Sequence, residues 1–297
     1  MKQRDAFAGF HPVNNFLYFA IVLSVSMFSM NPLYLFLSLL GAVSYSIRLK
    51  GLRKFSRSLL IMVPLLIFTA VINPVFNHQG ITILTYLPNG NPLTMESMVY
   101  GLFAAGMMIT VITWFSCYTE IMTSDKFIYL FGRIIPSLSL LISMTLRFVP
   151  KFRTHFSEVS AAQKSIGKSG ESARFRDRIQ NGVRILSIMI TWSMENAIET
   201  ADSMKSRGYG LPGRTAFSIY TFDRRDRILL LWLLSGGFFL LLAWKTGGLY
   251  FRFYPSIRGP ETGFLTVICM AVFLLFCLTP ALIGLYDDYV WRKLDAC

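Results

Sequence analysis

The chain has 297 residues, of which 54% are hydrophobic and only 15% are charged. The mean hydropathy of +0.50 exceeds that of ordinary water-soluble domains, so the composition indicates a membrane protein. The formal net charge of +13 would suggest a nucleic-acid partner if the chain were soluble and polar. Because its aromatic residues lie inside long apolar runs, we expect no nucleic acid among its partners.

Cysteine and histidine are too scattered to predict a metal site. The three histidines, at positions 11, 78 and 155, have no second histidine or cysteine at ligand spacing. The same holds for the four cysteines, Cys117, Cys269, Cys277 and Cys297. The polar amino end lacks the apolar core of a signal peptide, so nothing there need be removed. We expect no metal and no other cofactor bound by this chain alone.

Six apolar stretches approach the roughly 20 residues needed to cross a bilayer. They are Phe16–Met30, Leu33–Leu49, Leu59–Phe76, Met98–Cys117, Ile228–Trp244 and Phe264–Leu285. The first two flank Asn31-Pro32 and are short, so one of them could be tilted or re-entrant. We predict an all-α integral membrane protein with about six transmembrane helices and a long helical cytoplasmic region between the fourth and the fifth.

The chain divides into an N-terminal membrane domain, a cytoplasmic helical region and C-terminal spans, at residues 1–123, 124–227 and 228–297. Lys and Arg indicate the orientation because they are retained preferentially on the cytoplasmic side. None occurs between Arg57 and Lys126, as expected for two spans joined by an outer loop. With the amino end inside, the basic residues left outside are Lys245, Arg252 and Arg258. We therefore predict a multi-pass protein of the cell (inner) membrane with both termini in the cytoplasm.

Two stretches of the cytoplasmic interval have helical periodicity. The first follows Pro136, which suits a first helical turn. The second, from about Asn181 to Arg207, would be a helix roughly 40 Å long. Its apolar stripe consists of Val183, Leu186, Ile190, Met194, Ala197, Ala201 and Met204. Gly208 is a stop signal for this helix, and Gly167–Arg178 is the predicted connection between the two.

Catalytic and nucleotide-binding patterns are weak. Gly167-Lys168-Ser169 resembles the end of a P-loop, but Ala162 stands where that motif needs glycine, which favours a basic linker. No apolar stretch carries an ionisable residue near its centre, so we expect this chain to supply neither an ion pathway nor an energy source. Gly101 and Ala105 permit close helix packing, which we expect within this chain rather than against a partner.

Ser206-Arg207-Gly208 ends the second cytoplasmic helix. An arginine in the last turn is favoured by the helix dipole, and the following glycine by a left-handed cap. A functional interpretation is an exposed guanidinium that makes forked hydrogen bonds in a groove of a partner. The sequence around it decides between these interpretations.

Several motifs together resemble the transmembrane T component of energy-coupling factor (ECF) ABC transporters, the family that includes CbiQ. They are His11-Pro12, Asn31-Pro32, Leu146-Arg147-Phe148-Val149-Pro150, Ala162-Gln163-Lys164 and, most specifically, the run Ala201 to Gly210, which is similar to the family signature A-x-x-M-x-A-R-G-Y. The resemblance covers nearly the full length of the chain.

This resemblance implies a non-catalytic subunit that couples two ABC ATPases to a substrate-binding membrane protein, the S component. Segment 124–227 would be the coupling-helix region, and Arg207, with Ser206 and Gly208 beside it, would dock in a groove of one ATPase. ATP and Mg would be bound by the partner chains. The transported substrate would be a vitamin or a transition-metal ion such as cobalt or nickel.

The first coupling motif departs from the family pattern. Where Ala-Arg-Gly is expected, this chain has Ser165-Ile166-Gly167. Either Lys164 or Lys168 supplies a point charge without the guanidinium fork, or Ile166 docks in an apolar groove. A third alternative is that the two ATPases differ and only one requires arginine. We hypothesise asymmetric docking.

Two other functions remain as alternatives. One is a membrane-embedded enzyme that acts at the cytoplasmic interface, which would need a nucleophile or a metal cluster near the ends of the spans. The other is a self-contained secondary carrier, which is disfavoured because the chain lacks intramembrane charges and evident inverted repeats.

Overall fold

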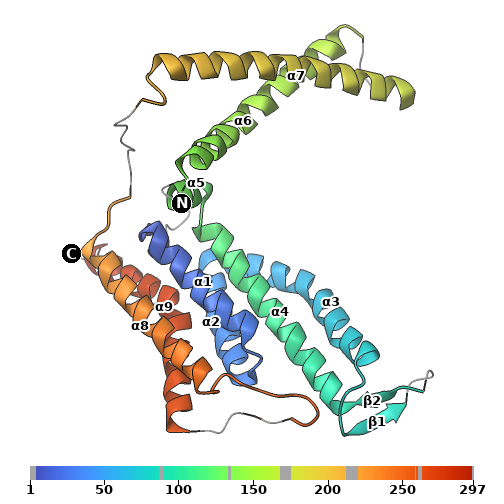
Figure 1. The fold of residues 1–297 in the computed structure, drawn as a ribbon, viewed down its shortest axis with the longest axis vertical. Coiled ribbons are helices and arrows are strands. Elements are labelled where there is room, and N and C mark those ends of the chain that lie inside the picture. The colour runs from blue at the N-terminus through green and yellow to red at the C-terminus, as the bar shows by residue number, and fades with distance from the viewer. Residues whose placement is uncertain are drawn as a thin grey trace. The chain divides into compact units, whose positions relative to one another are not determined.

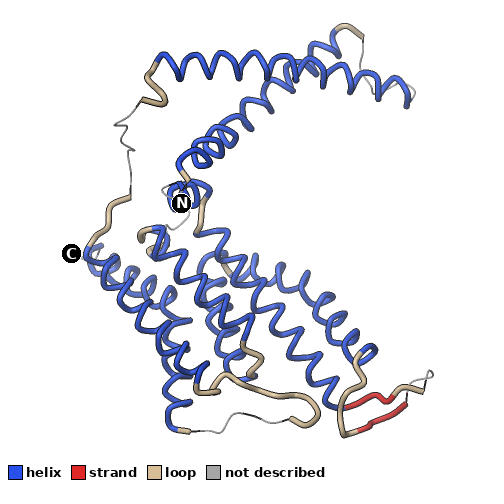
Figure 2. The backbone as a smooth tube through the Cα atoms, in the orientation of Figure 1, coloured by secondary structure: helices blue, strands red, loops and turns tan. Residues whose placement is uncertain are grey.

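The computed structural model describes residues 5–86, 90–132, 135–167, 175–211, 220–257, 259 and 263–295. A 3-10 turn, η1 (Phe7–Gly9), precedes the helices (Figure 1). These are α1 (Pro12–Phe28), α2 (Pro32–Lys50), α3 (Leu52–Phe76), α4 (Met95–Ile121), α5 (Ser124–Gly132), α6 (Pro136–Ser165), α7 (Phe175–Ser206), α8 (Arg224–Lys245) and α9 (Phe264–Asp295). A two-stranded antiparallel hairpin, β1 (Ile83–Tyr86) and β2 (Pro92–Thr94), lies between α3 and α4 (Figure 2). The predicted all-α membrane fold is confirmed.

The chain forms two compact units, which we describe separately. The first, here called the bundle, comprises Met1–Phe127 and Tyr220–Cys297. The second, here called the arm, comprises Ile128–Ile219 and contains α6 and α7. The two membrane segments of the sequence thus pack together as one unit. The functional division at residues 123 and 227 stays a prediction.

Local sequence explains where the bundle helices begin. Nδ1 of His11 accepts a hydrogen bond from the Val13 amide at 3.3 Å, and Pro12 occupies the first position of α1. Oδ1 of Asn31 does the same for the Leu33 amide at 3.0 Å, ahead of Pro32 in α2. Each pair combines a side-chain acceptor with a proline that has no amide hydrogen to satisfy. His11-Pro12 and Asn31-Pro32 are therefore helix starts.

The core of the bundle is aromatic, and several of its polar groups pair with one another or with the backbone. The Tyr18 ring stacks on Phe276 with centroids 5.4 Å apart, and its hydroxyl donates to the Cys277 carbonyl at 3.2 Å. Nε1 of Trp114 donates to the Ser38 hydroxyl at 3.0 Å. Such pairing is required where no water is available, because an unsatisfied polar group in hydrocarbon costs several kcal/mol.

Within the described residues, five helices are long and apolar enough to cross a membrane, namely α2, α3, α4, α8 and α9. They account for five of the six predicted spans. The remaining helix, α1, has 17 residues and lies at the short limit for a span. Helix α3 contains the predicted apolar stretch Leu59–Phe76 and begins earlier, at Leu52, because its polar first turns are helical too. The count of six spans remains a prediction for α1.

Small residues bring the bundle helices into close contact. A Cβ at Gly101 would lie 2.7 Å from the carbonyl oxygen of Ala70 on α3, and one at Gly236 would lie 2.8 Å from the ring of Phe276 on α9. Ala105, one turn beyond Gly101, is fully buried. The prediction that Gly101 and Ala105 pack within the chain is confirmed.

Candidate functional site

The arm consists of two long helices that cross near their middles. Nζ of Lys151 donates to Oδ1 of Asn196 at 2.7 Å, the ring of His155 stacks on Trp192 with centroids 4.1 Å apart, and Phe152 meets the same indole edge-on at 5.7 Å. Contacts closer to the carboxyl end of α6 thus involve residues closer to the amino end of α7. The two helices therefore cross in an antiparallel sense.

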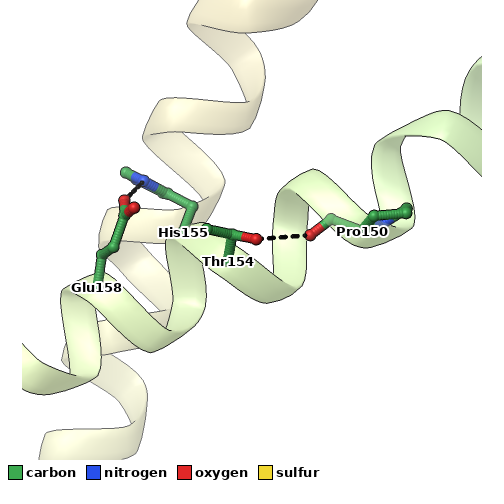
Figure 3. A network of polar contacts seen from close by, with 4 residues as sticks. All are labelled: Pro150, Thr154, His155 and Glu158. Atoms are coloured by element: carbon green, nitrogen blue, oxygen red, sulfur yellow. Dashed lines mark hydrogen bonds and ion pairs between the residues drawn. The ribbon is translucent and has the colours of Figure 1, made fainter.

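Helix α6 continues through Pro150, which lies inside it. Figure 3 shows the Thr154 hydroxyl donating to the Pro150 carbonyl at 3.2 Å, and the His155 ring beside the Glu158 carboxylate at 3.4 Å. The first bond stays within one turn of the helix. The same His155 ring stacks on Trp192 of α7.

Both helices project well beyond this crossing. About ten residues of α6 follow His155 and about fourteen residues of α7 follow Trp192, which at 1.5 Å per residue corresponds to roughly 15 and 21 Å. The two carboxyl ends leave the crossing in different directions (Figure 1). The arm therefore presents two separate helix tips, and these carry the two motifs that the sequence singled out.

The tip of α7 is built by glycine. Gly208 has φ +79°, a left-handed conformation that side chains disfavour. Its amide donates to the Lys205 carbonyl at 3.0 Å, and the Tyr209 amide donates to the Met204 carbonyl at 3.0 Å. This pair of bonds is the Schellman cap, which satisfies the last carbonyls of a helix. Arg207 is thereby held at the boundary of the helix, with its side chain exposed.

The tip of α6 has one of these two cap bonds and the same glycine conformation. Gly167 has φ +73°, its amide donates to the Lys164 carbonyl at 3.0 Å, and the Ile166 amide donates to the Ala162 carbonyl at 3.3 Å. The corresponding bond in α7, from Arg207 to Ser203, is also 3.3 Å. The sequences Lys164-Ser165-Ile166-Gly167 and Lys205-Ser206-Arg207-Gly208 therefore share these two bonds and the left-handed glycine, and they differ at the third residue.

The two tips present different chemistry. Among the described residues, the Arg207 guanidinium has no hydrogen-bond or ion-pair partner, so its donors face outward. At the matching position Ile166 is 64% exposed. Lys164 already has an interaction within the chain, and Lys168 lies outside the described residues. One tip is thus a forked cation and the other an apolar side chain.

The serines of the two motifs stabilise the helix ends rather than reach outward. The Ser165 hydroxyl donates to the Ala161 carbonyl at 3.0 Å, and the Ser206 hydroxyl donates to the Ser203 carbonyl at 2.8 Å. Both serines therefore use their hydroxyls within their own helix. In each motif the residue before the glycine, Ile166 or Arg207, is exposed.

The predicted start of the second helix was wrong. Helix α7 begins at Phe175 instead of Asn181, because Arg178 and its neighbours continue the helical pattern. Its 32 residues make it about 48 Å long rather than 40 Å. Of the predicted connection Gly167–Arg178, the part from 175 is helical, and 168–174 lies outside the described residues. The P-loop-like Gly167 is a helix cap.

The apolar stripe of α7 is not covered within the described chain. Val183, Leu186, Ile190 and Met194 are each more than half exposed. An open groove of about 480 Å³ follows α6, lined by Thr145, Phe148, Val149, Phe152, Arg153 and Phe156. Contiguous apolar surfaces of this kind mark sites of interaction with proteins or membranes.

Sequence reasoning missed the residues that hold the arm together. Trp192 received no role, and His155 was considered only as a metal ligand, yet their stacking makes the crossing. Aromatic residues on the polar side of an amphipathic helix were the available signal. Among the described residues, no three His, Cys, Asp or Glu side chains gather closely enough to hold a metal ion.

Comparison with known proteins gives a consistent result. The family model of CbiQ, described as cobalt transport protein, matches residues 9–217. An "Energy-coupling factor transporter transmembrane protein EcfT" from Lactococcus lactis subsp. cremoris is 26% identical over 213 residues, 69% of this chain and 77% of that protein.

Two Listeria proteins are also similar. The protein named EcfT 1 from Listeria monocytogenes is 25% identical over 205 residues, which cover 64% of this chain and 76% of that relative. A shorter match to the EcfT of Listeria innocua is 34% identical over 107 residues, 35% of this chain and 40% of that relative. The family model includes both helix tips of the arm, since it extends to residue 217.

Proposed function

The chain belongs to the CbiQ/EcfT family of transmembrane components of energy-coupling factor transporters, and on that basis we propose that it couples the ATPases of such a transporter to substrate uptake. In this proposal two ABC ATPase subunits bind the tips of α6 and α7. A substrate-binding S component packs beside the chain in the bilayer, and ATP-driven motion passes through the arm to that component.

One observation supports this proposal above all. Two helices end in the same backbone geometry, with a left-handed glycine after an outward side chain, at Ile166-Gly167 and Arg207-Gly208. A pair of equivalent tips suits a pair of related partners. A guanidinium presented without an internal partner suits forked hydrogen bonds in a groove.

The proposal includes asymmetric docking. Arg207 would form charge-assisted hydrogen bonds, whereas Ile166 would fill an apolar pocket. Lys164 is a weaker candidate for the first contact because it already interacts within the chain. Two different ATPases, each with its own groove, would satisfy both tips.

The basic residues support a cytoplasmic position for the end of the bundle where the chain leaves for the arm. Arg48 on α2 donates to Asp288 on α9 at 2.6 Å at this end, and Lys126 lies there too. At the other end of α2, Asn31 donates to the Gly248 carbonyl at 3.4 Å, close in sequence to Lys245. This asymmetry supports both termini in the cytoplasm and the cell membrane as the location.

The chemistry of transport would be divided among the chains. ATP and Mg would be held by the ATPases, and the S component would select the substrate, a vitamin or a transition-metal ion. The exposed stripe of α7 and the groove of α6 would be covered by these partners. This chain would then be a non-catalytic subunit that transmits force.

The test is to purify the tagged chain in detergent from its native membrane and to identify every protein that comes with it. We expect ABC ATPases and a small membrane protein. Vesicles that contain this complex should import substrate only when ATP is supplied. Recovery of the chain without any ATPase, under conditions that preserve membrane complexes, would refute the proposal, and uptake by the chain alone would favour a self-contained carrier.

A further inference from the structure

The chain leaves the bundle after Phe127 and returns to it at Tyr220. These two connections are separated by almost a hundred residues in sequence. Within the bundle, one short segment, Asp5–Asn15, contacts the residues next to both of them. We call it the N-terminal clasp.

The clasp holds the outgoing connection through a buried ammonium. Nζ of Lys126, which is 8% exposed, donates to the Ala8 carbonyl at 2.6 Å and to the Ile121 carbonyl at 3.2 Å. The Asn15 amide, oriented so that both of its ends are satisfied, accepts from the same Nζ at 3.1 Å and donates to the Phe7 carbonyl at 3.1 Å. One cation thus joins the clasp to the end of α4 and the start of α5.

The clasp holds the returning connection through a buried carboxylate. Oδ1 of Asp226, which is 5% exposed, accepts from the His11 amide at 2.8 Å and from Nδ2 of Asn14 at 3.3 Å. The same Asn14 amide donates to the Asp226 carbonyl at 2.9 Å. The His11 ring also packs edge-on against Phe222, with centroids 4.9 Å apart. The first turn of α8 is therefore fixed to the start of α1.

The clasp itself is anchored in the core. Phe7 is fully buried, and the centroid of its ring lies 5.2 Å from that of Tyr18 and 6.2 Å from that of Tyr45. The Tyr45 hydroxyl donates to Asp5 at 2.7 Å. Burial raises the pKa of Asp5, while this hydrogen bond and the charges of Arg48 and Lys126 oppose the shift. The segment cannot move without disturbing α1 and α2.

We propose that the N-terminal clasp is a positioning device that fixes the two chain connections of the arm to the bundle, with Lys126 and Asn14 as its key positioning residues. The inference rests on the proposed coupling function and adds residues to it that lie outside the two helix tips. Motion of the arm acts on the bundle through these two connections. If these connections were flexible, motion of the arm would not reach the bundle, and ATP would be hydrolysed without transport.

The test compares variants in the complete transporter, reconstituted in vesicles, by measuring substrate molecules imported per ATP hydrolysed. Lys126→Met removes the ammonium that binds the outgoing connection to the clasp. Asn14→Leu removes the amide that binds Asp226 at the returning connection, with little change of side-chain shape. Lys126→Arg restores a charged donor. Lys54→Met, at an exposed lysine on the first turn of α3, is the matched control.

We expect Lys126→Met and Asn14→Leu to co-purify with the ATPases and to hydrolyse ATP at near wild-type rates, but to import about threefold less substrate per ATP, or lower. Lys126→Arg should recover most of the ratio, and Lys54→Met should keep it. A merely structural role would lower the yield and Tm of the complex without changing the ratio in the molecules that remain.

An unchanged ratio in both Lys126→Met and Asn14→Leu would overturn the clasp, and so would a ratio lowered equally in Lys54→Met. If one variant fails to assemble, the other decides alone, because each breaks a different side. Failure of the proposed function is distinguishable: in that case the wild-type chain itself would bring down no ATPase.

Discussion

Replacement of Arg207 by glutamate tests the asymmetric docking of the two tips. The side chain is exposed and has no partner among the described residues, so the substitution removes no contact from the isolated chain. Its cost there is that of placing a negative charge at a helix carboxyl end, about 0.3–1 kcal/mol. A larger effect must come from a partner.

In the complex the expected cost is larger. Hydrogen bonds to a charged group contribute about 1.5–3 kcal/mol, which corresponds to about a 10- to 150-fold loss of ATPase affinity, and glutamate adds repulsion from any acidic groove. Ile166 is 64% exposed. Because only that fraction can be newly covered, Ile166→Ala would cost about 1.5 kcal/mol at about 0.8 kcal/mol per lost carbon.

The assay is the Kd of the ATPase pair for the detergent-solubilised membrane complex, followed by ATP-driven uptake in vesicles. Lys205→Glu is the control because it makes the same charge change in the same last turn and carries the same dipole cost. We expect Arg207→Glu to weaken binding more than Lys205→Glu or Ile166→Ala does, by up to about tenfold. Equal losses for Arg207→Glu and Ile166→Ala would refute asymmetric docking.

Three further predictions test the structure itself. Gly208→Ala should lower the unfolding free energy by about 1–2 kcal/mol because φ is +79°, whereas Gly182→Ala, in open space within α7, should raise it by up to about 1 kcal/mol; thermal unfolding of the two variants must shift in opposite directions. Burial lowers the pKa of His11 below 6.5, partly opposed by Asp226, so stability should fall as pH drops below about 6.5; a pH series of Tm values should show a smaller slope for His11→Asn, and identical slopes would contradict this. Gly101→Ala should destabilise the bundle by about 1–3 kcal/mol through its clash with a backbone carbonyl of α3, while Gly106→Ala, which would make an ordinary 3.5 Å contact, should not lower the melting temperature.

The sequence was most informative where one residue type determines a backbone feature. Apolar length predicted the spans, and the periodicity of α7 predicted its stripe. Gly208 predicted the end of that helix because few other residues adopt a positive φ without strain. Such signals are local, so they can be read without knowledge of the fold.

Contacts between distant parts of the chain could not be predicted in this way. Asp226 binds the amide of His11, 215 positions away, and Lys126 binds the carbonyl of Ala8. Their backbone partners leave no mark in the sequence, since every residue has an amide or a carbonyl. From the sequence alone, Lys126 is predicted to be an ordinary cytoplasmic lysine, and only the fold shows that it is buried.

The similarity of the two helix tips also could not be predicted, because the motif is recognised by its arginine and the first tip has none. Ser165-Ile166-Gly167 looks like a degenerate motif because the arginine is missing, yet its backbone shares two hydrogen bonds and the glycine conformation with the second motif. Glycine and the last carbonyls set the geometry of a helix end, and the residue before glycine contributes none of those bonds through its side chain. That position is free to match whatever groove it meets. Under the proposed function, two tips that differ at this position suit a pair of unlike ATPases. A symmetric pair of ATPases would present the same groove to Ile166 and to Arg207, and one groove does not suit both side chains.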